Sequence, residues 1–245
     1  MKADARPEDY QGIVAALDPA GAPCMTFVRR AAGEPSKIAV LSASYNPPTL
    51  AHLRMAELAH VDLGYPEVIL ELAIANVDKA VTDAPLHERL MMMGVLAESR
   101  PWLSVAVATH GRFLDKMAAL REHFPTADVC FIVGYDTLVR VFDPKYYTDR
   151  DAELRALFDQ TSFVCANREG SGDDALDGLL LLPANAPYAE GVRPMALDAY
   201  HAGLSSTAVR TSIASAQSRP DGLPEAVAAY IDGRGLYSRS GGDSP

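Results

Sequence analysis

The chain has 245 residues, of which 49% are hydrophobic, and carries a formal net charge of −10 at pH 7. This length is enough for one large domain with a buried core, and the composition is typical of a globular protein rather than a disordered one. The acidic balance excludes a general affinity for nucleic acid, because neutralising a phosphate backbone needs clustered lysine and arginine.

The first 36 residues are predicted to form an appendage, with a short amphipathic stretch followed by a Pro/Gly/Ala-rich segment. From residue 37 onward, apolar strand-like runs alternate with segments of helical periodicity. Strands are expected at residues 37–43, 68–74, 103–108, 128–133 and 162–166. Helices are expected at residues 49–63, 86–98, 113–123, 152–158 and 224–232, with a further helix beginning at Ser206.

This alternation predicts right-handed βαβ units and a parallel sheet covered by helices on both faces. The expected fold class is therefore α/β, a Rossmann-like doubly wound parallel sheet with a small C-terminal helical extension. The expected domain boundaries are an appendage over residues 1–36, one domain over 37–237 and a disordered Ser/Gly/Pro-rich tail over 238–245.

The turn after the first predicted strand is the first candidate site. It reads SYNPPTLAH over residues 44–52 and runs directly into a helix. Ligands of open parallel sheets bind at the carboxyl ends of strands, so an anion here would meet helix N–H groups, the hydroxyl of Thr49 and the imidazole of His52. The alternative interpretation is a prolyl turn with an ordinary capping threonine and a half-buried histidine.

This turn resembles the (G)SFNPx(H/T)xxH signature of the adenylyltransferases that make NAD or its deamido form from ATP and a pyridine mononucleotide. These enzymes belong to the HIGH-type nucleotidyltransferase superfamily. The resemblance implies that Thr49 and His52 contact the ATP phosphates, with His52 stabilising charge on the departing pyrophosphate. It also assigns Ser44 and Tyr45 to ATP binding and Asn46 to acceptor binding.

A second segment, LSSTAVR at residues 204–210, resembles the ISSTxxR motif of the same family. Hydroxyls and free N–H groups at a helix start suit an anion, and Arg210 lies one turn into that helix. Seen alone, the segment would be a serine cap beside a surface arginine. Together the two motifs imply that Thr49, His52 and Arg210 are catalytic. The residues of the second motif that are assigned to ATP are Ser205, Ser206, Thr207 and Arg210.

Two further segments agree with the family. Residues 76–79 (NVDK) resemble its PPHK stretch, which implies that Lys79 binds the acceptor phosphate and that Arg89, on the following helix, lines the acceptor pocket. Gly134 and Asp136 resemble its GxD motif near ATP. The alternatives are solvated surface cations and a carboxylate that caps a helix.

The resemblance covers residues 37–237 and departs from the family in three places. Ala43 replaces the usual glycine, NVD replaces PPH before Lys79, and the aromatic pair that holds the pyridine ring cannot be placed. Trp102 is assigned to acceptor binding, although its place before the third strand also suits the core. Other aromatic candidates, which the sequence does not rank, are His110, Phe113, Tyr146 and Tyr147.

The expected reaction is adenylyl transfer from ATP, with Mg²⁺ as cofactor, to nicotinamide or nicotinate mononucleotide. The alternatives are transfer of an adenylyl or cytidylyl group to another phosphorylated small molecule, such as phosphopantetheine, or a non-catalytic nucleotide-binding module. The sequence leaves open the amide or acid form of the acceptor and whether the chain is a homo-oligomer.

The remaining composition predicts a soluble, cytoplasmic protein. Its three cysteines, Cys24, Cys130 and Cys165, form no CxxC pair, so neither a disulfide framework nor a metal site is expected. The longest apolar runs are too short to cross a bilayer, and the N-terminus lacks the apolar core of a secretory signal. No nucleic-acid or membrane partner is therefore expected.

Overall fold

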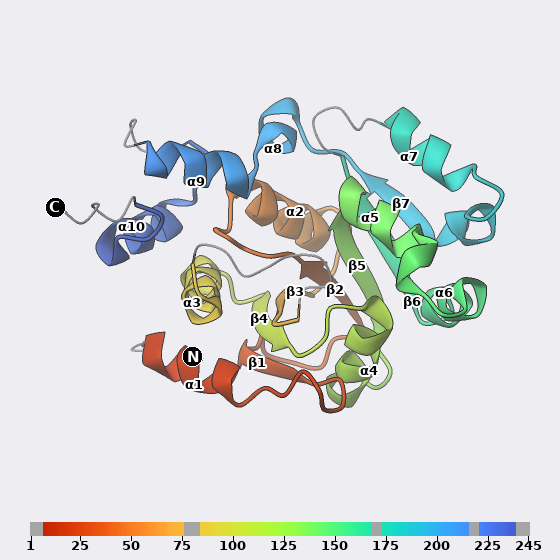
Figure 1. Cartoon of the computed structure of the whole chain (residues 1–245), viewed down its shortest axis with the longest axis horizontal. Coiled ribbons are helices and arrows are strands. Elements are labelled where there is room, and N and C mark those ends of the chain that lie inside the picture. Colours follow the sequence, from red (N-terminus) through yellow and green to blue (C-terminus); the bar gives the residue numbers. More distant parts are fainter. Residues whose placement is uncertain (1–6, 76–83, 168–172, 216–220, 239–245) are drawn as a thin grey trace, which may run out of the picture.

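A seven-stranded sheet runs through the computed structural model, which describes residues 7–75, 84–167, 173–215 and 221–238 (Figure 1). The strand order is β1-β4-β3-β2-β5-β6-β7. The strands are β1 (Met25–Arg29), β2 (Lys37–Ser42), β3 (Glu67–Ala73), β4 (Leu103–Ala108), β5 (Asp128–Gly134), β6 (Thr161–Ala166) and β7 (Val192–Met195). All neighbouring pairs are parallel except β1 with β4.

Helices cover both faces of the sheet and form two hydrophobic cores with it. Side chains of α1, α2, α3 and α10 contribute to one core, and side chains of α4, α5, α6 and α7 to the other. The α-helices are α1 (Pro7–Ala15), α2 (Leu50–Val61), α3 (Leu86–Ala97), α4 (Phe113–His123), α5 (Tyr135–Phe142), α6 (Arg150–Phe158), α7 (Asp173–Leu180), α8 (Ala199–Gly203), α9 (Ser206–Ala214) and α10 (Glu225–Arg234). The 3₁₀ turns are η1 (Pro144–Tyr146) and η2 (Ala186–Gly191).

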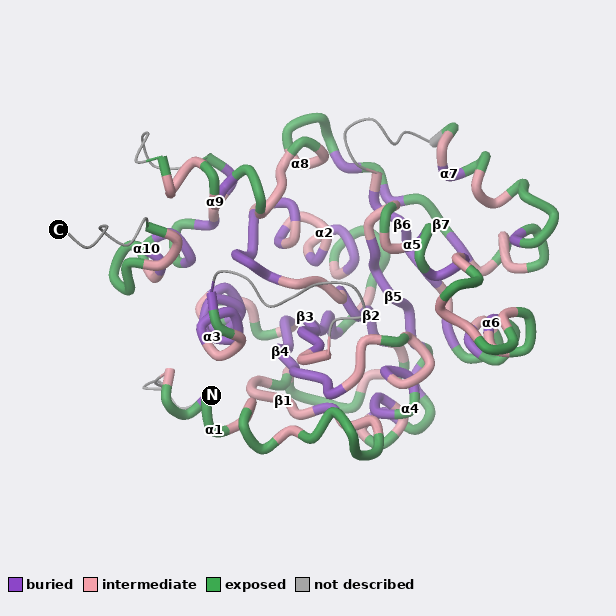
Figure 2. The backbone as a smooth tube through the Cα atoms, viewed as in Figure 1, coloured by how far each residue is buried: buried purple, intermediate pink, exposed green. Residues whose placement is uncertain are grey.

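Burial explains why the central strands read as continuous apolar runs. Every residue of β3 and β4 is buried, as expected for strands covered on both faces. Figure 2 shows buried backbone concentrated in the sheet and exposed backbone in the outer helices and loops. Cys130 and Cys165 lie in this core, and burial raises the pKa of both thiols, to about 11 for Cys165.

The first 36 residues are more than an appendage. Strand β1 pairs antiparallel with β4, with Met25 opposite Ala108, and covers an edge that would otherwise expose unpaired backbone groups. Helix α1 packs on α3, and Tyr10 is only 3% exposed. The sequence boundary at residue 36 therefore falls inside a continuous structural unit.

The predicted central strands and most helices are confirmed to within a few residues, and the parallel α/β class is confirmed. The extension is also confirmed as α9 and α10, whereas residues 239–245 of the expected tail lie outside the described residues. The sequence did not indicate β7, which has only four residues and includes an exposed arginine and proline. None of the described helices is long and apolar enough to cross a membrane.

The order of the strands places a crevice beside β2. The chain passes from β2 to β3 and β4 on one side, and then returns to β5, β6 and β7 on the other. The carboxyl ends of β2 and β5 thus flank the switch point, where open α/β sheets bind ligands.

Candidate active site

A cavity of about 410 Å³ opens at these carboxyl ends. Its size is that of a small-molecule site. The residues that line it come from the loops after β2 and β4, from the η1 segment and from several helices, including α2, α3, α4, α5 and α9. The candidate residues from the sequence that line it are Ser44, Asn46, Thr49, His52, Arg89, Gly134, Asp136, Ser205, Ser206, Thr207 and Arg210.

Three candidates are not placed there. Lys79 lies outside the described residues. The ring of Tyr45 is fully buried in the core beneath the turn, and its hydroxyl donates a hydrogen bond to the carbonyl of Leu41 at 2.5 Å, so the expected ATP contact of this side chain is not seen. Trp102 precedes β4, at the opposite end of the strand from the cavity, and stacks on His60 with ring centroids 4.4 Å apart. Trp102 is therefore packed against the core and is not among the residues that line this cavity.

The turn has an unusual backbone at Tyr45. Its φ of 44° lies in the left-handed region, which a bulky residue rarely adopts, and such outliers persist where the surrounding structure enforces them. Burial raises the pKa of the Tyr45 phenol well above its ordinary value, and the nearby charge of Glu71 adds to this effect. Ala43 is not among the described residues with positive φ, so replacing the family's glycine there introduces no backbone strain.

The imidazole of His52 is fixed by the start of its own helix. Thr49 is the N-cap of α2, and its backbone N–H donates to His52 Nδ1 at 3.1 Å, with its hydroxyl 2.8 Å from the same nitrogen. Because a backbone N–H can only donate, Nδ1 must accept, and the proton of the neutral ring lies on Nε2. The cavity-lining histidine thus has Nε2–H as its hydrogen-bond donor.

The second motif packs directly on the first. Arg210 Nη1 donates to the carbonyl of Asn46 at 2.7 Å, and the Ser206 hydroxyl donates to the carbonyl of Pro47 at 2.8 Å. Ser205 caps α9 by accepting the N–H of Ala208. Two segments about 160 residues apart in the sequence therefore form one wall of the cavity.

Two more C-terminal residues brace the same turn. The carbonyl of Gly222 accepts the N–H of Leu50 at 2.8 Å, and Gly222 has a φ of 90°. This positive φ favours glycine, and a Cβ here would also lie 2.7 Å from the end of the Leu204 side chain, which would have to shift. The Tyr237 hydroxyl donates to Asn46 Oδ1 at 2.8 Å.

Helix α10 is tied to α3 through a buried carboxylate. Glu88 is 4% exposed, and it accepts hydrogen bonds from Arg234 Nη2 at 2.6 Å and from the Tyr230 hydroxyl at 2.5 Å. Burial raises the pKa of Glu88, but the hydrogen bonds from Arg234 and Tyr230 outweigh burial, so the net pKa is lowered. The next residue, Arg89, donates to the carbonyl of Ser44 at 3.4 Å, so α3 connects the extension to the turn.

The opposite wall is aromatic. Phe113, Tyr146 and Tyr147 line the cavity, whereas His110 does not line it and lies beside Thr109 Oγ1, 2.8 Å away. The Tyr147 hydroxyl donates to the carbonyl of Val141, and burial raises the pKa of Tyr147 to about 12. Three of the four unranked aromatic candidates are thus gathered on one side.

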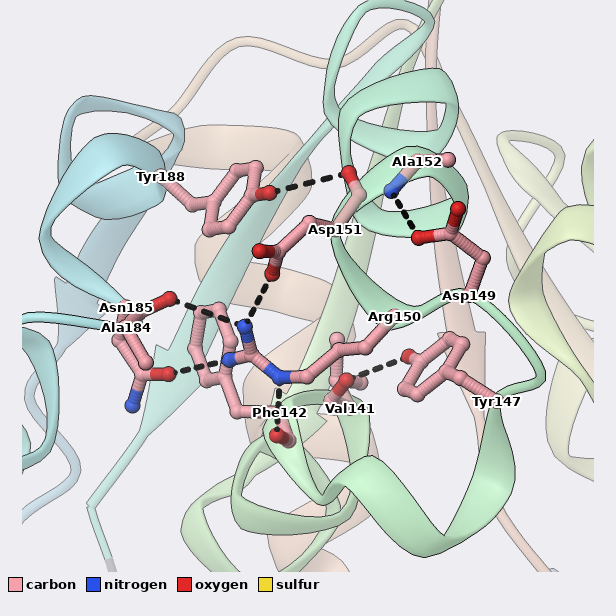
Figure 3. Close-up of polar contacts among 10 residues, drawn as sticks. All are labelled: Val141, Phe142, Tyr147, Asp149, Arg150, Asp151, Ala152, Ala184, Asn185 and Tyr188. Carbon is pink, nitrogen blue, oxygen red and sulfur yellow. Dashed lines mark hydrogen bonds and ion pairs between the residues drawn. The ribbon is translucent and has the colours of Figure 1, made fainter.

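Figure 3 shows how this aromatic segment is held. Arg150 donates to the carbonyl of Phe142 at 3.0 Å, and so joins the two helices that bracket η1. It also donates to the carbonyl of Ala184 and to Asn185 Oδ1, at 3.0 and 2.5 Å. Because Arg150 connects α5, α6 and the loop before η2, it fixes the segment that presents Tyr146 and Tyr147.

Three further cations line the cavity: Arg112, Lys116 and Arg140. They join Arg89 and Arg210, so five cations and one carboxylate, Asp136, are found among the described lining residues of a protein with net charge −10. Lys116 and Arg112 are paired with Glu71 and Glu153, yet the lining is still less acidic than the molecule as a whole, which favours anion binding there. The sequence did not indicate these three cations. Two signals could have pointed to two of them: Arg112 follows shortly after the third predicted strand, and Arg140 lies four residues after Asp136, on the same face of a helix.

Among the described residues, no group of three or more His, Cys, Asp or Glu side chains is arranged to hold a metal ion.

The chain is similar to known nucleotidyltransferases along most of its length. The family model described as cytidylyltransferase-like matches residues 40–212. A Schizosaccharomyces pombe protein named "Putative nicotinamide mononucleotide adenylyltransferase" is 34% identical over 142 residues, which is 55% of this chain and 55% of that protein. A Caenorhabditis elegans protein named nicotinamide/nicotinic acid mononucleotide adenylyltransferase 2 is 23% identical over 83% of this chain and 99% of its own length.

A solved structure shares the fold. It is Plasmodium falciparum nicotinic acid mononucleotide adenylyltransferase complexed with NaAD, which matches with a TM-score of 0.63 over 82% of this chain and 97% of that chain. The sequence identity of the pair is 15%, so this likeness concerns the arrangement of the sheet and its helices.

Proposed function

Because the chain belongs to the cytidylyltransferase-like family, we propose that it is a nucleotidyltransferase that moves the adenylyl group of ATP to a pyridine mononucleotide. The products are NAD or deamido-NAD and pyrophosphate. One observation carries the proposal: Arg210 and Ser206 bond to the backbone of the turn that presents Thr49 and His52, which places all four side chains on one cavity.

In the proposed reaction, a phosphate oxygen of the mononucleotide attacks the α-phosphorus of ATP in line. The new P–O bond forms as the bond to the bridging oxygen breaks, and pyrophosphate leaves with that electron pair; Mg²⁺ carried by ATP would neutralise part of its charge. No covalent enzyme intermediate is needed, so the side chains position the substrates and stabilise charge.

The wall built from α2 and α9 would hold the triphosphate. His52 would donate from Nε2 to the pyrophosphate oxygens as charge builds there, and Arg210 would supply a permanent positive charge one helical turn inside α9. Asp136, in the first turn of α5, would accept from the ATP sugar. Arg89 and the aromatic wall are left for the acceptor.

The test is a pyrophosphate-release screen with the purified chain and Mg²⁺. ATP and CTP are each combined with nicotinamide mononucleotide, nicotinate mononucleotide and phosphopantetheine. We expect release with ATP and at least one pyridine mononucleotide. Release only with CTP or only with phosphopantetheine would contradict the proposal. A rise in melting temperature with ATP, but no turnover with any acceptor, would instead indicate a binding module.

A further inference from the structure

A buried ion pair lies beneath the aromatic side of the cavity, between β3 and α4. Lys116 Nζ is 2.7 Å from Glu71 Oε2 and 2.5 Å from the Ser42 hydroxyl. The side chain of Lys116 is 5% exposed and that of Glu71 is fully buried. Lys116 and Ser42 line the cavity, while Glu71 stands behind them.

The pair is incompletely satisfied within the described residues. Two of the three ammonium N–H groups of Lys116 have the partners given above, and Glu71 Oε1 has no hydrogen-bond partner there. A buried ion pair seldom stabilises a fold more than apolar side chains of the same volume, and an unmatched buried oxygen costs about 1–3 kcal/mol. Stability alone therefore does not account for this arrangement.

Lys116 lies beside the aromatic wall of the cavity and contacts Ser42, where β2 ends. Its ammonium lies 5.2 Å from the centre of the Phe113 ring, which lines the aromatic wall with Tyr146 and Tyr147. The groups proposed to hold the triphosphate, Thr49, His52 and Arg210, lie at the start of α2 and on α9. The third N–H of Lys116 is thus available to a ring substituent with an acceptor oxygen.

The charge of the pair decides which substituent fits. Glu71 already neutralises Lys116, and Arg112 on the same wall is paired with Glu153. A carboxylate placed against the Lys116–Glu71 pair would bring a net negative charge into a buried site, whereas a carboxamide oxygen can accept the N–H and add no charge. A lysine without Glu71 would favour the carboxylate, because a charge-assisted hydrogen bond is the stronger one.

We propose that the Lys116–Glu71 pair is a specificity determinant which selects the carboxamide form of the pyridine mononucleotide, with Lys116 donating to the amide oxygen and Glu71 cancelling its charge. This inference rests on the proposed function. It assigns to Lys116 and Glu71 the choice between the amide and acid forms of the acceptor, which the motifs at residues 44–52 and 204–210 do not determine.

The experiment measures kcat/KM for nicotinamide and nicotinate mononucleotide at saturating ATP, with melting temperatures for every variant. Wild type should prefer the amide. Glu71→Gln keeps the shape and removes the compensating charge, so the amide-to-acid ratio should move toward the acid by about tenfold, which is about 1.4 kcal/mol. Lys116→Met alone would leave Glu71 buried and unpaired, so the second variant is the double Lys116→Met/Glu71→Met.

The double variant separates a structural role from a recognition role. Its melting temperature should stay near that of wild type, because the pair is replaced by apolar side chains of similar length. Its KM for the amide should rise about fivefold, for one lost hydrogen bond of about 1 kcal/mol, with KM for ATP unchanged. A wild-type preference for the acid, or a ratio that stays constant in both variants, would overturn this inference alone. Turnover of neither acceptor by wild type would overturn the proposed function and this inference with it.

Discussion

The two walls of the cavity are built in different ways. The triphosphate wall uses two short segments, residues 44–52 and 204–210, which are joined by hydrogen bonds between side chains and backbone carbonyls. The aromatic wall draws its residues from α4 and the η1 segment, supported from behind by Glu71 of β3 and by Arg150. The residues of the first wall are thus contiguous within two short motifs, whereas those of the second wall come from separate elements that only tertiary packing brings together.

This difference explains why the sequence predicted the residues of the first wall and missed those of the second. Thr49 and His52 are three residues apart at a helix start, so their spacing alone indicated a shared anion site. Lys116 and Glu71 are 45 residues apart on two different elements, and only the pairing of β3 with β4 and the position of α4 bring them together. The fold class followed from periodicity, while the antiparallel β1 did not, because an edge strand of five residues has little pattern of its own.

The largest effect is expected from removing the imidazole of the triphosphate wall. His52→Ala should lower kcat by about 10²–10³ and leave the fold intact, because one well-aimed transition-state donor is lost. The measurements are single-turnover pyrophosphate release and the melting temperature. His60→Ala is the matched control, since it lies on the same helix but stacks on Trp102 away from the cavity. Near-normal turnover of purified His52→Ala would exclude the proposed role.

Arg150 supports the aromatic wall from behind, so a substitution there should weaken binding of the acceptor and not of ATP. Arg150→Met removes the bonds to Phe142, Ala184 and Asn185, so the η1 segment should lose its fixed position. We expect KM for the pyridine mononucleotide to rise about tenfold, or about 1.4 kcal/mol, with KM for ATP unchanged. Arg155→Met, an exposed position on the same helix, is the control. Equal changes in both KM values would contradict the independence of the two walls.

A smaller effect is expected where the extension contacts the turn. Tyr237→Phe keeps the ring and removes the hydrogen bond to Asn46, so kcat/KM should fall by up to about fivefold, for about 1 kcal/mol. The melting temperature should change little. Tyr200→Phe, which removes a surface hydroxyl bonded to Asp221, serves for comparison. If the two variants have the same activity, the contact with Asn46 does not position the turn.

The smallest effect concerns pH. The pKa of Glu88 is lowered in the folded chain, so its pair with Arg234 stabilises the fold above the unfolded pKa of about 4.3. That contribution is lost as the pH falls through the lower folded pKa. Thermal unfolding between pH 6 and pH 3 should therefore show a steeper loss in wild type than in Glu88→Gln. Glu57→Gln, at a more exposed pair with Arg100, should retain the wild-type slope.

The contact between Tyr237 and Asn46 joins residues 191 positions apart, so the turn depends on residues at the far end of the chain. During synthesis, the turn emerges early, while the residues that brace it emerge late: Ser206, Arg210, Gly222 and finally Tyr237. A chain that stops before these residues lacks all four supports of its phosphate turn. The turn therefore has its full set of supports only when the C-terminal extension is in place.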